Sequence, residues 1–467
     1  MTPETGCAGP LSTAAVVLVV LSSEGRLASR SACGSHRPQR AGGVSGRRPR
    51  WPKTCLATKL ALRASGKPQY TAAWVRASTI STGVSPTYRD GERVVLTRPV
   101  LHACGGRQNA AMDALADRIT RHADALERDR RSPLYIALMR GAADSARRDG
   151  PVADVFPDGP GAPGSVPAGR LLAALHHLVL AGDAPQLARY YASVGGEEPL
   201  DHAWAAAEAT IEGNLEEVRR LAARTVQTNE PGRSAALYGA LLRLADRHRL
   251  PIRLLEPGAS AGLNLHADRY RYVVAGRPLG DPASRLSFDE PWEGLPVEEP
   301  WMVESFLCLS ERCGCDPAPI DVSTQEGALA LLSYIWPDEL DRLARIREAI
   351  TIARAHPAIV EAAAAVAWVE RRLAKPHPGR LTVVWQSVMR QYLGETERRQ
   401  VEDRIEEAGT HATDEQPLAW VALEPGDDHL SNFTITCRSW PGDGRGVTIA
   451  DSGAHGPPVS WRPAHRD

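Results

Sequence analysis

The chain has 467 residues, of which 43% are hydrophobic and 24% are charged, and its formal net charge is −1. These values are typical of a globular protein with room for two or three domains. A net charge near zero argues against nucleic-acid binding and against electrostatic binding to membrane surfaces. No run of sequence approaches the roughly 18–20 apolar residues of a membrane-spanning helix. We therefore expect neither a nucleic-acid partner nor a membrane partner.

The eight cysteines are spread along the whole chain, which argues against a disulfide framework. Cys313-Gly-Cys315 is too short a spacing for a zinc knuckle, and no histidine pair follows it, so no metal site is expected. Reduced thiols favour a cytoplasmic protein. Secretion is the weaker alternative, because the apolar stretch Ala14–Leu21 has the length of a signal-peptide core but no Lys or Arg precedes it.

Residues 1–110 are rich in Arg, Ser, Gly and Pro and have a basic excess. Such a composition buries little apolar surface, so we expect a disordered extension. A start of translation near Met112, where regular patterning begins, is the alternative. The segment is interpreted as a solvated basic tail rather than as a nucleic-acid patch.

Residues 111–248 are expected to form an α-helical lobe. Apolar residues recur at spacings of three and four over Leu115–Leu126, which indicates one buried helix face. Pro133 suits the first turn of a second helix. The adjacent His176 and His177 should point about 100° apart on a helix, so we expect one to be buried and the other exposed.

Residues 249–463 show strands separated by helices, which predicts a mostly parallel seven-stranded sheet ending in an antiparallel hairpin. The long helical segment should break at Trp336-Pro337, because proline cannot continue the hydrogen-bond ladder. The expected strands are Ile252–Leu255, Met302–Leu309, Ile359–Glu361, Thr382–Trp385, Ala419–Leu423, Phe433–Arg438 and Gly446–Ala450. The expected helices are Leu263–Asp268, Gln325–Ala355, Ala363–Leu373 and Thr396–Ala408.

The most informative segment is the loop after the first of these strands. The strand ends at Glu256, small and turn-forming residues follow, and a helix is expected near Leu263. Gly258 and Gly262 allow a ligand to approach the backbone closely, and the N–H groups that open the helix favour an anionic group. The pattern Glu-x-Gly-x-Ser-x-Gly differs from the G-x-G-x-x-G of dinucleotide binders and from the P-loop.

This loop resembles the first motif of class I S-adenosylmethionine (SAM)-dependent methyltransferases, E/D-x-G-x-G-x-G, with Ser260 in place of the middle glycine. The resemblance implies a Rossmann-like fold and SAM as cofactor. It departs from the family at Ala362 and Ala363, where many relatives have an acidic or polar residue near the adenine. The implied cofactor-binding residues are Glu256, Gly258, Ser260, Ala261, Gly262 and Asn264, with Asp316 as the ribose partner.

From about Met112 to Trp461 the chain also resembles a bacterial family known as domain of unknown function 2332. At Gln386 that family usually has His, and an amide cannot replace a titrating base. The segments that carry the resemblance are VQTNEPGRSAAL (226–237), LLEPGASAGLNLHADRYRY (254–272), GCDPAPID (314–321), LLSYIWPDE (331–339), VVWQSVMRQYL (383–393) and AHGPPVSW (454–461).

Two polar clusters are candidates for the substrate side of the site. One follows the fourth strand, and the other precedes the first strand of the sheet. Turn formation by 229–232 and core packing by Tyr392 are the alternative interpretations, and His455 is expected in a surface loop. The candidate catalytic residues are Gln386, Tyr392 and Glu230, and the candidate substrate-binding residues are Asn229, Arg233, Ser387 and Gln391.

Together these features predict a cytoplasmic enzyme that transfers a methyl group from SAM to a small molecule. The alternative is a non-catalytic Rossmann-like module that binds a ligand or a protein. Binding of SAM and turnover would distinguish the two.

Overall fold

The computed structural model describes residues 105–161, 166–426 and 433–463, with side chains from residue 110 onwards. All of them lie in one compact unit, Val100–Asp467. The expectations for the basic extension up to residue 104, and for the signal-like stretch Ala14–Leu21, fall outside the described residues. Within the described part of the chain, no helix is both long enough and apolar enough to cross a membrane.

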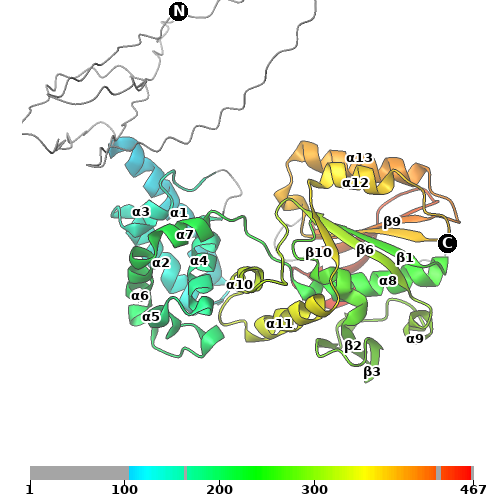
Figure 1. Cartoon of the computed structure of the whole chain (residues 1–467), viewed down its shortest axis with the longest axis horizontal. Helices are drawn as coiled ribbons and strands as arrows, with labels where there is room; N and C mark the ends of the chain where they lie inside the picture. Colours follow the sequence, from blue (N-terminus) through cyan, green and yellow to red (C-terminus); the bar gives the residue numbers. More distant parts are fainter. Residues whose placement is uncertain (1–104, 162–165, 427–432, 464–467) are drawn as a thin grey trace, which may run out of the picture. The chain divides into compact units, whose positions relative to one another are not determined.

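The first part of the described chain is a helical lobe, as expected (Figure 1). Leu115, Ile119 and Leu126 of its first helix are buried in a shared apolar core. Four of the helices have proline in the first turn, where its missing N–H would have no helical partner. The α-helices are α1 (Gly105–Arg128), α2 (Pro133–Arg147), α3 (Pro151–Val155), α4 (Pro167–Ala181), α5 (Pro185–Ala188), α6 (Ala203–Gly213) and α7 (Leu215–Ala222), with short 3₁₀ helices η1 (Ala192–Val194) and η2 (Leu200–His202).

The expectation that only one of His176 and His177 is buried is wrong, because both are buried in α4. The His176 Nε2 atom lies 2.8 Å from the Ser193 hydroxyl, and its Nδ1 lies 3.3 Å from the Ser333 carbonyl. Helix α10 (Gln325–Ser333) packs against α4 and covers the face that would otherwise meet solvent. Burial lowers the pKa of His176 to about 4, so its ring is neutral at pH 7.

The second part of the described chain contains a mixed sheet of nine strands rather than the expected seven. Its order is β5-β12-β11-β10-β9-β8-β1-β6-β7. The pairs from β7 to β9 are parallel, those from β9 to β12 are antiparallel, and β5 pairs with β12 in parallel. The strands are β1 (Ile252–Pro257), β5 (Trp292–Glu293), β6 (Leu309–Asp316), β7 (Ile359–Ala362), β8 (Leu381–Ser387), β9 (Leu418–Pro425), β10 (Phe433–Trp440), β11 (Val447–Gly453) and β12 (Gly456–Trp461).

One expected strand is misplaced. Met302–Leu309 contains the end of a short helix, α9 (Pro300–Glu304), and the strand β6 begins only at Leu309. Pro300 starts that helix, whereas β6 itself begins with partly exposed polar residues that hide its strand character. The insertion between β1 and β6 also holds the 3₁₀ helix η4 (Leu263–Arg269) and a small sheet of β2 (Arg271–Val274), β3 (Arg277–Gly280) and β4 (Ser287–Asp289).

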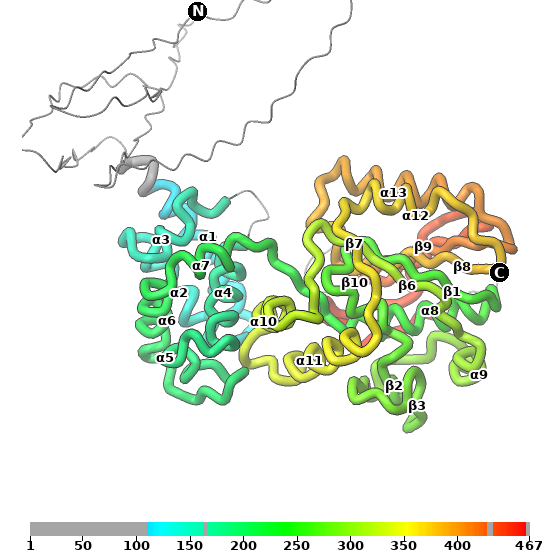
Figure 2. The backbone as a smooth tube through the Cα atoms, viewed as in Figure 1, coloured from blue at the N-terminus to red at the C-terminus, as the bar shows by residue number. Residues whose placement is uncertain are grey.

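Helices cover both faces of the sheet. In Figure 2, α12 and α13 lie on one face, and α8 and α11 lie on the other. The predicted break at Trp336-Pro337 is confirmed, because it falls between α10 and α11. The bounds are α8 (Ser234–His248), α11 (Leu340–Ala355), α12 (Ala365–Leu373) and α13 (Glu395–Thr410), with 3₁₀ helices η3 (Pro231–Arg233) and η5 (Arg390–Tyr392).

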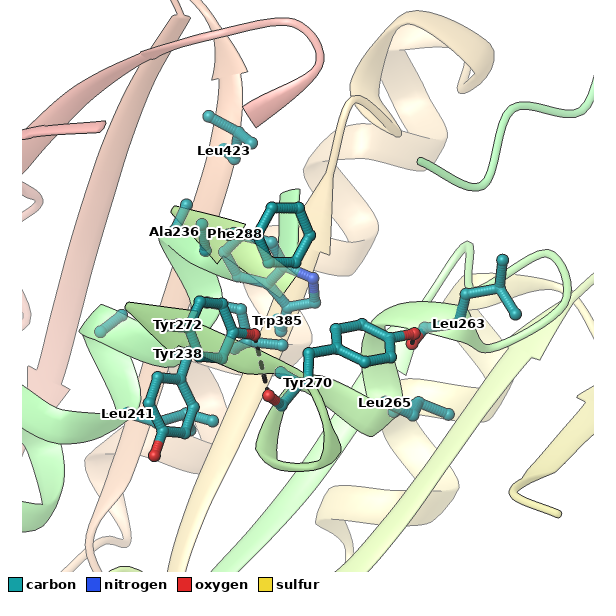
Figure 3. Packing of buried hydrophobic residues seen from close by; sticks show 14 of the residues in the cluster. Ala236, Tyr238, Leu241, Leu263, Leu265, Tyr270, Tyr272, Phe288, Trp385 and Leu423 are labelled. Carbon is teal, nitrogen blue, oxygen red and sulfur yellow. Dashed lines mark hydrogen bonds between the residues drawn. The ribbon is translucent and has the colours of Figure 1, made fainter. Parts of the chain in front are cut away.

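Aromatic stacking holds the small sheet against the face of the large sheet that carries α8 (Figure 3). The rings of Tyr238 and Tyr272 stack with centroids 4.5 Å apart, and Phe288 stacks on Tyr272 at 5.5 Å. The Tyr272 hydroxyl donates to the Ala267 carbonyl at 2.8 Å, so its buried polar tip is satisfied. This packing fixes the segment that follows the loop after β1.

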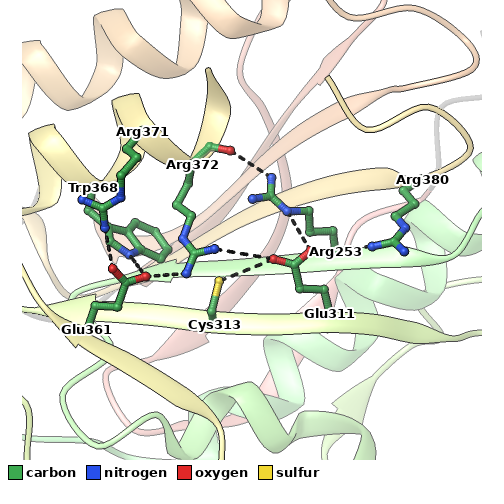
Figure 4. Close-up of polar contacts among 8 residues, drawn as sticks. All are labelled: Arg253, Glu311, Cys313, Glu361, Trp368, Arg371, Arg372 and Arg380. Carbon is green, nitrogen blue, oxygen red and sulfur yellow. Dashed lines mark hydrogen bonds and ion pairs between the residues drawn. The ribbon is translucent and has the colours of Figure 1, made fainter. Parts of the chain in front are cut away.

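On the opposite face, arginines surround two glutamates (Figure 4). Glu311 pairs with Arg253 at 3.1 Å and with Arg380 at 3.7 Å. Cys313 lies beside them, and burial raises the pKa of its thiol to about 11. The thiol therefore stays protonated at pH 7, a state that does not suit metal binding. No cluster of three or more His, Cys, Asp or Glu suited to a metal is found among the residues described.

Candidate functional site

A pocket of about 210 Å³ opens at the carboxyl ends of β1, β6 and β8. Ligands of open α/β sheets bind at this edge. The chain segment 225–228, which follows α7, forms another wall of the pocket. The lining residues that the following paragraphs use are Gln227, Arg233, Gly258, Ser260, Asp316, Ser387, Val388, Met389 and Tyr392.

The loop after β1 has an alternating left-handed backbone. Gly258, Ser260 and Gly262 have φ angles of 74°, 54° and 74°. Glycine adopts this conformation freely, whereas serine adopts it at a cost of about 1–2 kcal/mol. A Cβ atom on Gly258 would lie 2.7 Å from Cγ of Met389, so the bare backbone allows the loop to pack against the segment after β8.

We expected the N–H groups at the start of the helix near Leu263 to be free for an anion. This expectation is wrong for Leu263, the first residue of that helix. Leu263 opens the 3₁₀ helix η4, and its N–H donates to Oδ1 of Asn229 at 2.8 Å. Asn229 therefore anchors the loop and is not a pocket residue. Ala261, Gly262 and Asn264 are also absent from the pocket wall. The Leu263 N–H is therefore not free to bind an anionic group of a ligand.

Asp316, at the end of β6, holds three parts of the site together. Its Oδ2 accepts the Ser260 N–H at 3.1 Å. Its Oδ1 accepts the Ala318 N–H at 2.9 Å and the Gln227 side-chain amide at 3.1 Å. A carboxylate has about four acceptor sites, so a ligand hydroxyl could bond Asp316 beside the Gln227 amide or in its place.

Glu256 is buried at the end of β1, behind the pocket wall. Its Oε2 atom has no hydrogen-bond partner among the described residues. Burial raises the pKa of Glu256 to about 8, despite the opposing charge of Arg233. The carboxyl group is therefore mostly protonated at pH 7, and the strand end is less acidic than its sequence indicates.

Gln386 is buried next to the pocket and does not line it. Its amide donates to Oε1 of Glu424 at 3.0 Å, and its carbonyl oxygen accepts from the Trp420 indole at 3.3 Å. The geometry gives Gln386 a positioning role instead of the expected contact with substrate.

Glu424 was missed by the sequence analysis. It lies near the end of β9, as Glu256 lies near the end of β1, so an acid at a strand end was the available signal. Its Oε1 also accepts the N–H groups of Met389 and Arg390, at 3.1 and 3.2 Å. Its Oε2 has no partner among the residues described, and burial raises its pKa. Glu424 thereby fixes the segment after β8.

That segment contains a second strained residue. Val388 has φ of 54°, which is a rare conformation for a β-branched side chain. Its N–H donates to the Leu423 carbonyl at 2.9 Å, which holds the turn in place. Strain of this kind concentrates at functional sites. The turn directs Ser387 and Tyr392 to the pocket, whereas the exposed Gln391 does not line it.

Tyr392 is 53% exposed, so the alternative of a buried core residue is wrong for it. Glu230 has the opposite environment. It is buried away from the pocket wall, where Oε1 accepts the Gly232 N–H at 2.9 Å and Oε2 accepts from Arg342 at 2.8 Å. Burial opposes its ionisation, but Arg342 and Arg345 outweigh that effect and lower its pKa. Glu230 is thus a structural ion-pair residue, which contradicts the expected catalytic role.

His455 is partly exposed, in the loop between β11 and β12, and its Nδ1 lies 3.9 Å from Glu230. It is therefore near the ion pairs of Glu230 and outside the set of residues that line the pocket.

A family model described as "Uncharacterized protein conserved in bacteria (DUF2332)" matches residues 116–461. The chain belongs to this family. The match spans the helical lobe and the large sheet, so it includes every pocket residue of this DUF2332 protein. No curated protein and no solved structure matched the chain.

Arg233 is the cationic group on the pocket wall of this DUF2332 protein. It ends η3, directly before α8, and its side chain is 5% exposed. Its Nε donates to the Ala454 carbonyl at 2.9 Å, and this hydrogen bond orients the guanidinium group. Burial lowers the pKa of Arg233, but an arginine remains charged at neutral pH.

Proposed function

We propose that this DUF2332 protein binds SAM in the pocket and transfers its methyl group to a small molecule. The observation that carries the proposal is the alternating left-handed backbone at Gly258, Ser260 and Gly262, in the loop that leaves the first strand of the sheet. The central parallel strands support it, because β7-β6-β1-β8-β9 is the order third-second-first-fourth-fifth of a Rossmann-like sheet.

The pocket residues suit a nucleoside with a charged amino-acid tail. Gly258 leaves room for close contact with the backbone, and the buried hydroxyl of Ser260 has no hydrogen-bond partner among the described residues. Asp316 has the position of an acid that accepts bonds from ribose hydroxyls, beside the Gln227 amide or in its place. The present volume of about 210 Å³ is below the usual 300–1,000 Å³ of ligand pockets. A bound nucleoside would therefore extend beyond the present pocket, past the wall that the segment 225–228 forms.

When bound, SAM supplies an electrophilic methyl group for an in-line displacement. Positioning can lower such a barrier by about 7–11 kcal/mol in the best cases, so few acid-base groups are needed. In this chain, Ser387 and Tyr392 would orient the acceptor, and Glu424 would hold their backbone through the N–H of Met389. Glu256, protonated at pH 7, would support the loop without adding a second negative charge.

The second candidate is a non-catalytic ligand-binding module. One observation favours it: the amide of Gln386 is fixed between Glu424 and Trp420, and no histidine lines the pocket among the residues described. A reaction that needs a strong base would have none at this wall.

Titration calorimetry of the whole chain with SAM and with S-adenosylhomocysteine tests the proposal. We expect binding of both, weakened at least tenfold in Asp316→Asn. Asp321→Asn, whose side chain only caps its own turn outside the pocket, is the control and should bind normally. No heat with either compound would refute SAM binding. Binding without methyl transfer to any member of a metabolite panel would favour the module.

A further inference from the structure

Arg233 is a buried charge without an ion pair. None of the carboxylate oxygens in the described part of the chain lies within the 4.0 Å that defines a salt bridge from its nitrogens. The only hydrogen bond found for its side chain joins Nε to the Ala454 carbonyl. The two terminal nitrogens, which form the recognition fork of an arginine, make no hydrogen bond or ion pair with the described residues.

The acids around Arg233 compensate for this charge only in part, because burial outweighs their effect and lowers its pKa. Glu230 is engaged by Arg342, Arg345 and the Gly232 N–H. Burial keeps Glu256 mostly protonated at pH 7. Glu424 binds Gln386 and two backbone N–H groups through one oxygen. A buried guanidinium without an ion pair is unfavourable, so its place on a pocket wall points to an anion that arrives with a ligand.

We propose that Arg233 binds an anionic group, a carboxylate or a phosphate, of the ligand that fills the pocket. The planar fork of the guanidinium matches both groups through two parallel hydrogen bonds. Hydroxyl groups of Thr225, Thr228 and Ser387 line the same pocket and can add further donors. Asp316 and Glu397 also line the pocket, so the anion must lie on the side of Arg233, where the guanidinium fork outweighs their repulsion.

The anion has two possible sources if the proposed function holds, on which this part of the inference rests. One is the carboxylate of the amino-acid tail of SAM, and the other is an acidic group of the methyl acceptor. Ser387 and Tyr392, at and after the end of β8, line the same pocket as Arg233. Asp316, the expected ribose partner, ends β6 on the other side of β1. This position favours the acceptor.

Thermal unfolding of the whole chain with inorganic phosphate and, separately, with succinate tests the anion site without any cofactor. A ligand that binds only the folded state raises the unfolding midpoint. We expect the rise in the wild type and its loss in Arg233→Gln. Arg390→Gln is the matched control, because Arg390 lies beside the pocket, is half exposed and pairs with Glu402. It should respond as the wild type does.

Arg233→Lys tests whether misfolding explains a lost response, because lysine keeps the charge but lacks the planar guanidinium. This variant should retain part of the increase in unfolding midpoint that the anion causes. Because the charge is unpaired in the free protein, Arg233→Gln should unfold without anion at or above the midpoint of the wild type. An equal anion response in Arg233→Gln and the wild type, or no response in the wild type, would overturn the inference.

The source of the anion is tested by comparing S-adenosylhomocysteine with 5′-methylthioadenosine, which lacks the carboxylate. A loss of at least tenfold in affinity in Arg233→Gln for the first compound alone assigns the anion to the cofactor. Unchanged affinity for both, with the succinate response lost, assigns it to the acceptor. If neither nucleoside binds the wild type while phosphate or succinate does so through Arg233, the anion site stands and the proposed function fails.

Discussion

The helical lobe and the carboxyl edge of the large sheet treat buried polar groups differently. In the lobe, the buried polar atoms that lack partners among the described residues belong to neutral groups, as in Tyr191 and Trp204. At the sheet edge such atoms include a carboxyl oxygen of Glu256 and one of Glu424, and Arg233 has no ion pair there. Burying a charged group without an ion pair, as at Arg233, costs far more than burying a neutral group. The lobe therefore has the character of a structural core, and the unpaired charge at the edge supports the proposal of a ligand site there.

Leu175→Ala should have the largest effect on the free energy of unfolding, and it tests whether the lobe contributes to stability alone. Leu175 is fully buried in α4, so its truncation leaves a cavity and lowers the free energy of unfolding by about 3 kcal/mol. Urea denaturation measures the loss. Calorimetry with S-adenosylhomocysteine below the transition should give the affinity of the wild type. A weakened affinity would mean that the lobe contributes to the site.

Glu256→Gln should change the pH dependence of stability. The folded-state pKa of about 8 lies above the ordinary 4.5, so the folded state holds the proton more tightly. The resulting stabilisation is complete below the ordinary pKa and disappears as the pH rises through 8. Between pH 6 and pH 9 the wild type should therefore lose about 3 kcal/mol relative to the glutamine variant.

Urea denaturation of both proteins at pH 6 and pH 9 measures this difference. The same change at Glu208, which is partly exposed and pairs with Arg148 on the lobe, serves as the control for the loss of one carboxyl group. Parallel pH profiles of the wild type and Glu256→Gln would show that Glu256 is ionised in the folded protein.

Ser260→Gly should change the free energy of unfolding least, and in the opposite direction to Ser145→Gly in the lobe. Glycine removes the strain of a left-handed serine and should raise the free energy of unfolding by about 1 kcal/mol. Ser145 lies inside α2, where a change to glycine should lower the free energy of unfolding by about 1 kcal/mol. Thermal unfolding of both variants checks the pair. Destabilisation by both would mean that the Ser260 hydroxyl has a stabilising partner.

The strands that carry the site were predictable because they show the plainest patterns. The buried run of β1 followed by small residues, and the apolar run of β8, locate two walls of the pocket. β6 was misplaced because half of it is polar and partly exposed, and β12 was missed because prolines at 457 and 458 argue against a strand. Pattern reasoning locates strands that are buried on both faces better than those at the margins.

The positions of some site residues were predictable from the sequence, whereas the roles of others were not. Gly258, Ser260 and Asp316 lie where the loop and the strand ends place them. The roles of Glu230 and Gln386 were not predictable, because their partners, Arg342 and Glu424, are far away in sequence. The sequence shows which polar residues are near a strand end. It does not show whether a distant side chain has already used their hydrogen-bonding capacity.

The hydrogen bond from Arg233 to the Ala454 carbonyl spans 221 positions of the chain. The guanidinium therefore reaches its final orientation only after the last hairpin, β11 and β12, has joined the sheet. During synthesis the ribosome must release the chain at least as far as Ala454 before this contact can form. A small molecule that depends on Arg233 would then stabilise the finished protein selectively, with no benefit to partly folded chains.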